Sequence, residues 1–123
     1  MSLSGTIHVA VVDDDENLCR SLGRLLDASD IQPMIYLSAE AFLADPHHLR
    51  FDCLLLDVQF DGMSGIDLLR HLSQSRIKIP VIIITADDDS EARVEALAAG
   101  CKAYFRKTDS GADVLDAIRR LIA

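Results

Sequence analysis

Polar residues follow four apolar runs of this chain, at the point where each run ends. In chain order they are Asp13, Asp14, Asp57, Thr85 and Lys107. If the runs are parallel strands, their carboxyl ends share one edge of a sheet, which is where open α/β sheets place ligand sites. Clustered carboxylates suit a hard, oxygen-seeking cation such as Mg²⁺. A cation joined by a hydroxyl and an ammonium would in turn suit a phosphoryl group.

Four consecutive acidic residues begin at Asp13. Asp15 and Glu16 are typical of the start of a helix, where a carboxylate caps the first turn. Asp13 and Asp14 differ, because Asp57 is expected at the same sheet edge. Carboxylates that lie close together repel one another unless a cation or a proton intervenes. Binding of Mg²⁺ is therefore the economical explanation.

Asp57 has the position expected of a phosphoryl acceptor. Aspartate forms an aspartyl phosphate in transport ATPases, so a carboxylate can act as the nucleophile toward phosphorus. The plainer alternative is a second metal ligand without covalent chemistry. We favour the acceptor, because the Thr85 hydroxyl and the Lys107 ammonium could bond the phosphoryl oxygens and offset their charge.

The elements that would position these side chains follow from the spacing of apolar residues. Short β-branched runs alternate with segments of helical periodicity. The runs span residues 7–12, 33–37, 52–56, 79–85 and 103–105. Strict alternation of strand and helix predicts parallel strands joined by right-handed crossovers. We therefore expect an α/β fold with a doubly wound, five-stranded parallel sheet and helices on both faces.

Each expected helix carries an apolar stripe that should face the sheet. The stripes are Leu18, Leu22, Leu25 and Leu26 in the first helix, Ala41, Phe42 and Leu43 in the second, Ile66, Leu69 and Leu72 in the third, Val94, Leu97 and Ala98 in the fourth, and Val114, Leu115, Ile118, Leu121 and Ile122 in the fifth. Ser38 is expected to cap the second helix, and Asp89 or Ser90 the fourth.

Length and composition exclude several classes of function. The 123 residues fit one domain, residues 1–123 with an ordered core from about residue 6, and no apolar run approaches the ~20 residues that cross a bilayer. The net charge of −8 argues against nucleic-acid contact by this domain, because such contact depends on Lys and Arg. Three scattered cysteines favour neither disulfides nor zinc and suit a reducing cytoplasm. The chain stops at or inside its fifth helix, so an output domain could follow in a longer protein.

These motifs, in this order and spacing, resemble the receiver domains of bacterial two-component response regulators from Ile7 to Ala123. They are Val11-Val12-Asp13-Asp14, Leu55-Leu56-Asp57-Val58 with Gly62-Met63-Ser64-Gly65, Ile83-Ile84-Thr85-Ala86 and Tyr104-Phe105-Arg106-Lys107. The stretch Ser38-Ala39-Glu40-Ala41-Phe42-Leu43 further resembles receivers of the FixJ type, which usually precede a helix-turn-helix DNA-binding domain. The resemblance implies the flavodoxin-like strand order 2-1-3-4-5.

The resemblance also implies a role for each site residue. They are Asp57 as phosphoacceptor, Asp13, Asp14, Asp57 and the Gln59 backbone carbonyl as Mg²⁺ ligands, Thr85 and Lys107 as phosphoryl contacts, and Thr85 with Tyr104 as a switch. The phosphoryl donor would be a sensor histidine kinase or a phosphotransfer protein. The switch would bias a surface made of the fourth helix, fifth strand and fifth helix, which could form a homodimer or control a transcriptional output domain. Such a domain is a signalling phosphoacceptor, not an enzyme, and catalyses at most its own phosphorylation and dephosphorylation.

Two dipeptides depart from the receiver pattern. Phe60-Asp61 stands where most receivers have Met-Pro, and Lys107-Thr108 stands where they have Lys-Pro. The Lys-Pro bond is typically cis, whereas a cis bond before a non-proline residue costs ~2.5–4 kcal/mol. We therefore predict a trans Lys107-Thr108 bond and a displaced loop into the last helix. Gln59 and Asp87 are expected to flank the path of the water that hydrolyses the phosphoryl group.

Two other functions remain open on the sequence alone. Asp13-Asp14-Asp15 partly satisfies the DxD motif of haloacid-dehalogenase-like phosphatases, with Asp13 as nucleophile, but Asn17 stands where that motif needs Thr or Val. The other is a receiver-like interaction module that is never phosphorylated. The retained acids, hydroxyl and ammonium argue against this module, whereas Asp61 and Thr108 favour it.

Overall fold

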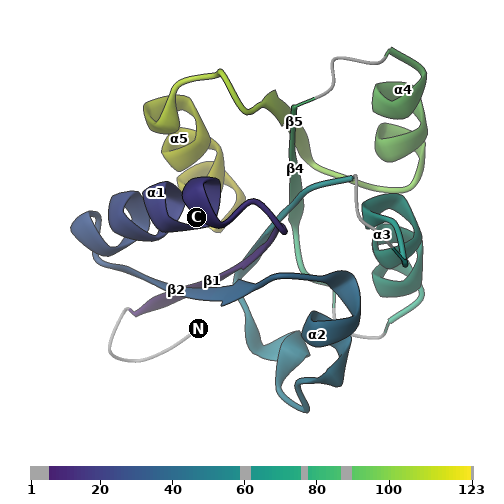
Figure 1. The fold of residues 1–123 in the computed structure, drawn as a ribbon, viewed down its shortest axis with the longest axis horizontal. Helices are drawn as coiled ribbons and strands as arrows, with labels where there is room; N and C mark the ends of the chain where they lie inside the picture. The colour runs from purple at the N-terminus through teal and green to yellow at the C-terminus, as the bar shows by residue number, and fades with distance from the viewer. Residues whose placement is uncertain (1–5, 59–61, 76–77, 87–89, 123) are drawn as a thin grey trace.

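The computed structural model describes residues 6–58, 62–75, 78–86 and 90–122 (Figure 1). The strands are β1 (Ile7–Val12), β2 (Ile31–Tyr36), β3 (Cys53–Leu56), β4 (Val81–Thr85) and β5 (Ala103–Arg106). The helices are α1 (Glu16–Ala28), α2 (Ala39–Ala44), α3 (Gly65–Ser73), α4 (Ser90–Ala98) and α5 (Gly111–Ile122), with a short 3₁₀ helix, η1 (His48–Arg50).

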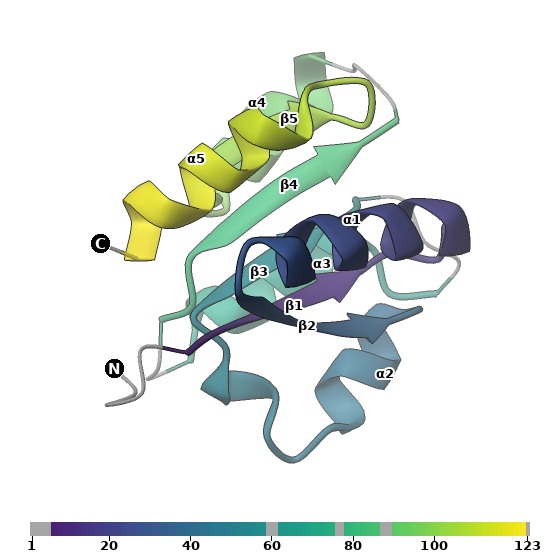
Figure 2. The ribbon, with the colours of Figure 1, turned by 90° about the vertical axis from the view of Figure 1, so that its left-hand side faces the viewer.

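The strands form one parallel sheet in the order β2-β1-β3-β4-β5. Helices α1 and α5 cover one face of the sheet, and α2, α3 and α4 cover the other (Figure 1). The strand arrows point the same way in Figure 2, so the carboxyl ends of the strands meet at one edge. The doubly wound α/β fold and its strand order are thus confirmed.

Three strands begin at other residues than the sequence predicted. β3 differs least, because it begins at Cys53 instead of residue 52. β2 begins at Ile31 instead of residue 33, and Ile31 pairs with Ile7 of β1. β4 begins at Val81 instead of residue 79. Pro80 precedes it and has no N–H to give to the ladder, so the regular pairing starts one residue later.

Apolar side chains fill a layer on each face of the sheet. Leu22, Leu26 and Ile118 are buried in the layer beneath α1 and α5. Phe42 and Leu68 are buried in the layer beneath α2, α3 and α4. Because both faces are covered, β1, β3 and β4 are almost continuously apolar instead of alternating. The predicted stripes of α1, α3 and α5 lie in or beside these layers.

Side-chain oxygens fix where three helices begin. The backbone N–H groups of Leu18, Ala41 and Asp67 donate to Asp15 Oδ1 at 3.1 Å, Ser38 Oγ at 3.0 Å and Ser64 Oγ at 3.1 Å. Each bond satisfies an N–H that the first turn of a helix cannot pair by itself. The predicted Ser38 cap is confirmed. Of the two candidate caps of α4, Ser90 is the first residue of the helix, and Asp89 lies outside the described residues.

The predicted apolar stripe of α4 is wrong. Val94 is 67% exposed and Leu97 is 49% exposed, and Ala98 is also exposed. The helix instead turns Ala96 toward the core, and Ala99, just past the end of the helix, packs against the same core layer. The larger apolar side chains of α4 are left on the solvent side.

The predicted stripe of α2 needs a smaller correction. Ala41 is exposed, whereas Ala39 and Phe42 are fully buried. These two residues are three positions apart, which places them on the same side of a helix.

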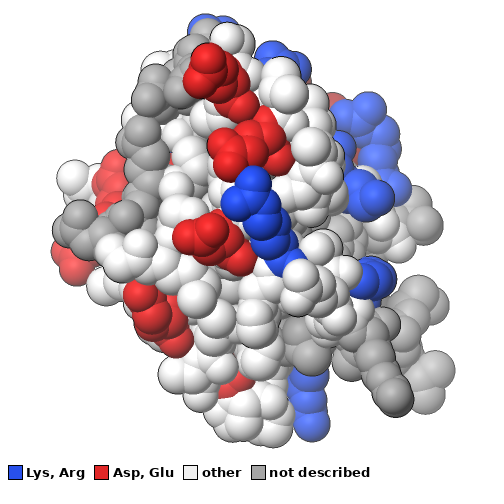
Figure 3. All heavy atoms as spheres, turned by 90° about the vertical axis from the view of Figure 1, so that its right-hand side faces the viewer, with Lys and Arg blue, Asp and Glu red and all other residues white. Residues whose placement is uncertain are grey.

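On the face that carries α3 and α4, acidic side chains gather toward the left and middle of the view and basic side chains mostly toward the right, with one basic side chain between acidic ones near the middle (Figure 3). Arg70 of α3 lies 2.8 Å from Glu95 of α4 and 3.8 Å from Asp67. The pair with Glu95 links the two helices, whereas the pair with Asp67 lies within α3. Exposed pairs such as these contribute little stability. In the part of the chain that the structure describes, no helix is both long and apolar enough to cross a bilayer.

Candidate phosphoryl and metal site

Three buried polar side chains lie at the carboxyl ends of three strands. Asp13 follows β1, Asp57 follows β3, and Thr85 is the last residue of β4. Their exposed fractions are 3%, 4% and 0%. Acidic side chains are almost never fully buried unless they are paired, so this placement marks a built site.

Backbone hydrogen bonds between neighbouring strands continue past the strand ends and hold these residues. The N–H groups of Asp13, Asp57 and Lys107 donate to the carbonyl oxygens of Tyr36 at 3.0 Å, Val12 at 3.0 Å and Thr85 at 2.9 Å. Each site residue is therefore fixed to the adjacent strand. The sheet itself sets the distances between the side chains.

Lys107 is the cation at the centre of the site. Its Nζ lies 3.3 Å from Oδ2 of Asp13 and 3.3 Å from Oδ2 of Asp57. Oδ2 of Asp15 lies 3.7 Å away. Burial by itself would lower the pKa of Lys107, but the Asp57 and Asp13 carboxylates outweigh it and raise that pKa. The ammonium therefore stays charged at neutral pH.

The Asp13 carboxyl group is buried beside Asp57, which disfavours its ionised form. Burial raises its pKa from 3.8 to about 6, and the charge of Asp57 adds to the rise. A hydrogen bond from the Asp15 N–H at 2.9 Å and the Lys107 ammonium act in the opposite direction. The carboxylates of Asp13 and Asp57 together carry more negative charge than the Lys107 ammonium neutralises.

This geometry fits a divalent cation. One carboxylate oxygen from each of Asp13, Asp14 and Asp57 can be chosen so that all three lie within 4.8 Å of one another. Asp14 is exposed while its two partners are buried, so the oxygens open toward solvent on one side. Oxygen ligands, partial exposure and excess negative charge are the features that Mg²⁺ sites share. Gln59, the expected backbone ligand, lies outside the described residues.

Tyr104 lies on β5, beside β4, where it pairs with Ile83. The ring packs against the core layer beneath α3 and α4, and its hydroxyl oxygen is shielded from solvent. The guanidinium carbon of Arg93 lies 5.5 Å from the ring centre, which is a cation–π distance. The expected aromatic of the switch is thus a half-buried side chain that touches α4 through Arg93.

Residues 9–119 match the family described as Response regulator receiver domain. The chain belongs to this family. It is 36% identical to the transcriptional regulatory protein FixJ of Rhizobium meliloti (strain 1021), over 94% of this chain and 55% of FixJ. It is also 36% identical to the response regulator protein TmoT of Ectopseudomonas mendocina, over 90% of this chain and 50% of TmoT.

A solved structure titled as the crystal structure of FixJ-N has the same fold as this receiver. The TM-score is 0.85 at 35% identity, over 94% of this chain and 93% of that one. The receiver spans about half the length of the curated relatives it matches. The family match supports phosphorelay signalling, and it leaves the haloacid-dehalogenase alternative without support.

The dipeptide Lys107-Thr108 is where this receiver departs from the family pattern. Its peptide bond is trans, because the described residues contain no cis peptide bond. The prediction of a trans bond is confirmed. The turn that follows is closed by Asp109, whose Oδ2 accepts from the Arg106 N–H at 2.8 Å and whose own N–H donates to the Arg106 carbonyl at 2.9 Å. Lys107 still reaches the site. Phe60, Asp61 and Asp87 lie outside the described residues.

Three contacts near the site were not expected from the sequence. Asp15, predicted only as a helix cap, also approaches Lys107. Glu40 of α2 accepts a hydrogen bond from the Met63 N–H at 3.0 Å. Gly65 packs so tightly that a Cβ there would lie 1.9 Å from the Asp57 carbonyl oxygen. The last two join segments far apart in the chain or depend on backbone packing, so residue type alone carries no signal of them.

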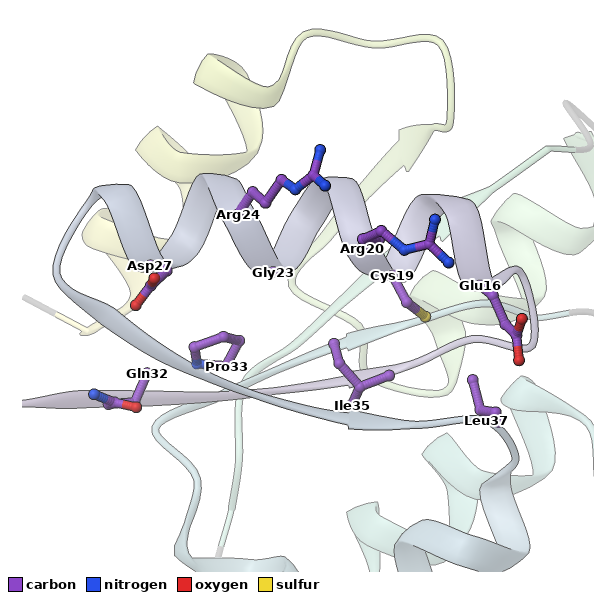
Figure 4. A pocket seen from close by; sticks show the side chains of 10 residues that line it. All are labelled: Glu16, Cys19, Arg20, Gly23, Arg24, Asp27, Gln32, Pro33, Ile35 and Leu37. Carbon is purple, nitrogen blue, oxygen red and sulfur yellow. The ribbon is translucent and has the colours of Figure 1, made fainter.

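A separate hollow lies between α1 and the edge strand β2 (Figure 4). It has a volume of about 850 Å³ and is lined by Glu16, Cys19, Arg20, Gly23, Arg24, Asp27, Gln32, Pro33, Ile35 and Leu37. Asp57, Thr85 and Lys107 do not line it. The Cys19 thiol on its wall donates to the Asp13 carbonyl at 3.2 Å. The candidate site of Asp57, Thr85 and Lys107 therefore lies at the sheet edge and not in this hollow.

Proposed function

We propose that Asp57 accepts a phosphoryl group in a Mg²⁺-dependent reaction. The observation that carries this proposal is the convergence of Asp57 and Thr85, both buried, with the Lys107 ammonium at the end of three adjacent strands. A buried carboxylate within 3.3 Å of a cation is held ready for a reaction that adds negative charge. A metal site alone would not need the lysine.

In the reaction, an Asp57 carboxylate oxygen forms a bond to phosphorus, and the bond between phosphorus and the donor's leaving group breaks. The leaving group takes the electron pair of that bond with it. Lys107 and the Thr85 hydroxyl bind the transferred oxygens. Asp13, Asp14, Asp57 and the Gln59 carbonyl would hold Mg²⁺, which would neutralise charge at the phosphoryl group. The protein contributes position and charge, so the domain is a signalling phosphoacceptor and not an enzyme with turnover on other molecules.

Phosphorylation would act on the surface formed by α4, β5 and α5. A phosphoryl group adds about −1.5 to −2 charges and strong acceptor oxygens next to Thr85. A Thr85 hydroxyl drawn toward those oxygens changes the space beside Tyr104, one strand away. Tyr104 contacts Arg93 of α4, so the change passes to a helix with few buried side chains.

For the whole protein we propose a transcriptional response regulator. FixJ is described as a transcriptional regulatory protein and TmoT as a response regulator protein, and this chain matches about half of each. A sensor histidine kinase or phosphotransfer protein would be the donor, and a C-terminal output domain or a second copy would respond to the switch surface. Cys19, Cys53 and Cys101 are free and buried, which suits a reducing cytoplasm.

Labelling with acetyl phosphate tests the proposal. The protein is incubated with acetyl phosphate and Mg²⁺, and the modified residue is mapped by mass spectrometry. We expect modification at Asp57, loss of labelling in Asp57→Asn, and loss of labelling when EDTA replaces Mg²⁺. Labelling at Asp13 would favour the phosphatase alternative. An unlabelled wild-type protein that also fails to bind Mg²⁺ would favour the inert interaction module.

A further inference from the structure

Asp109 closes the turn that carries Lys107 out of β5. Its Oδ2 accepts a hydrogen bond from the Arg106 backbone N–H at 2.8 Å, and its own N–H donates to the Arg106 carbonyl oxygen at 2.9 Å. A guanidinium nitrogen of Arg106 also lies 3.8 Å from Oδ1 of Asp109. Lys107 and Thr108 stand between the bonded pair. Lys107 therefore lies inside a four-residue turn that both a backbone bond and a side-chain bond close.

Both ends of this turn are anchored to the fold. On one side, Arg106 is the last residue of β5 and pairs with Thr85 of β4. On the other side, Ser110 precedes α5, and its Oγ accepts a hydrogen bond from the Ala112 N–H at 3.1 Å. The helix then buries Val114 in the core layer beneath α1 and α5. Asp109 therefore joins two fixed elements across the turn.

The peptide groups on either side of Lys107 determine where its side chain begins and points. The group before it is held by β4, because the Lys107 N–H donates to the Thr85 carbonyl at 2.9 Å. The group after it, which leads into Thr108, lies within the turn that Asp109 closes. Between these two fixed groups the lysine stem leaves the chain, and its Nζ lies 3.3 Å from Oδ2 of Asp57.

We propose that Asp109 is a positioning residue, which holds the Lys107 ammonium beside the phosphoacceptor Asp57. The inference rests on the proposed function, in which that ammonium binds the oxygens of the transferred phosphoryl group. A lysine side chain has a flexible four-carbon stem, so an ammonium carried by a loose turn would spend less of its time beside Asp57. A turn that is closed before the phosphoryl donor arrives supplies this orientation in advance.

Three variants separate the hydrogen bond of Asp109 from its charge. Asp109→Ala removes both, whereas Asp109→Asn removes the charge and keeps an acceptor oxygen on a stem of the same length. Asp113→Ala is the matched control, because it removes an exposed acid from the first turn of α5. Amide hydrogen exchange of Arg106 without Mg²⁺ reports on the bond itself. It should be faster in Asp109→Ala than in the wild-type protein, and near the wild-type rate in the other two variants.

The rate of labelling by acetyl phosphate at saturating Mg²⁺ reports on the placement of Lys107. Loss of one hydrogen bond should slow labelling about three- to tenfold in Asp109→Ala. Asp109→Asn and Asp113→Ala should stay within about twofold of the wild-type rate.

The same substitution in a protein without the lysine separates positioning from a general structural defect. Lys107→Met has no ammonium to misplace, so the addition of Asp109→Ala should slow its labelling by less than about a further twofold. A contact that merely kept the fold intact would slow labelling by the same factor whether or not the lysine is present. Unequal factors in the two backgrounds are therefore the signature of the positioning role.

Four results would overturn the positioning role. They are unchanged Arg106 exchange in Asp109→Ala, faster exchange with a wild-type labelling rate, equal slowing by Asp109→Asn and Asp109→Ala, and equal slowing of the wild-type and Lys107→Met proteins. A wild-type protein that is not labelled at Asp57 would instead refute the proposed function. The two failures are distinguishable, because the positioning role fails in a variant while the wild-type protein is still labelled.

Discussion

At the scale of single residues, Asp13 makes the metal-free protein less stable as the pH rises. Its pKa is about 6 in the folded chain and 3.8 ordinarily, so the folded state binds the proton more tightly than the unfolded state does. Below about pH 4 the group is protonated in both states, so Asp13 costs no folding free energy. The cost rises with pH and reaches its full value of about 3 kcal/mol above pH 6. We predict that Asp13→Asn raises the unfolding free energy at pH 7.5 by up to this amount and flattens the decline between pH 4 and 6.

Urea unfolding in EDTA measures this effect, with Asp116→Asn on the exposed side of α5 as the control. Added Mg²⁺ should stabilise the wild-type protein and the control more than Asp13→Asn. A destabilised Asp13→Asn protein would mean that the ion pair with Lys107 outweighs the cost of burial.

Lys107 gives a second prediction at this scale, because it has two opposed effects. Its ammonium lies 3.3 Å from two of the expected metal ligands, so it repels a cation that arrives there. It also stabilises the oxygens of a transferred phosphoryl group. We predict that Lys107→Met binds Mg²⁺ at least about threefold more tightly but accepts a phosphoryl group from acetyl phosphate at least about tenfold more slowly. If the affinity for Mg²⁺ and the rate of phosphorylation both fell in Lys107→Met, Lys107 would be needed mainly to hold the fold.

At the scale of the elements, α4 differs from the other long helices in how little of it is buried. Its buried residue is Ala96, whereas α3 buries Leu68, Leu69 and Leu72. We predict that Val94→Ser changes the unfolding free energy by less than about 0.5 kcal/mol, whereas Leu69→Ala costs about 2–5 kcal/mol. Chemical denaturation of the two variants checks the contrast. A large loss in Val94→Ser would place that residue in the core after all.

The same elements show what the sequence could and could not predict. The strands and the five polar residues at their ends were predictable, because burial on both faces leaves continuous apolar runs and parallel strands share one carboxyl edge. The side of α4 that faces the sheet was not predictable, because Val94 and Leu97 have helical spacing whether or not a sheet lies beneath them. The bond from Glu40 to Met63 and the turn closed by Asp109 depend on where loops meet in space, which local residue patterns do not encode.

At the scale of the whole molecule, the surface of α4, β5 and α5 is the part that phosphorylation would change. Val94 and Leu97 expose apolar area there, and Arg93 connects the helix to Tyr104. We predict that acetyl phosphate converts the protein to a dimer through this surface, and that Val94→Asp with Leu97→Asp keeps it monomeric by burying charge in the contact. Sedimentation velocity gives the mass of each species. Both proteins should be labelled at equal rates. A dimer of the double variant would show that copies meet elsewhere.

The tight packing of Gly65 against Asp57 bears on how receiver-like sequences diverge. Any side chain at this position would overlap the Asp57 carbonyl oxygen and the Val58 Cα, at 1.9 Å and 2.6 Å. A single substitution there would displace the acceptor while leaving all three acids, the threonine and the lysine in the chain. A paralogue could therefore lose phosphorylation yet still display every reactive group. Among duplicated receivers, the residue at this glycine position should separate signalling copies from silent ones where the acidic residues cannot.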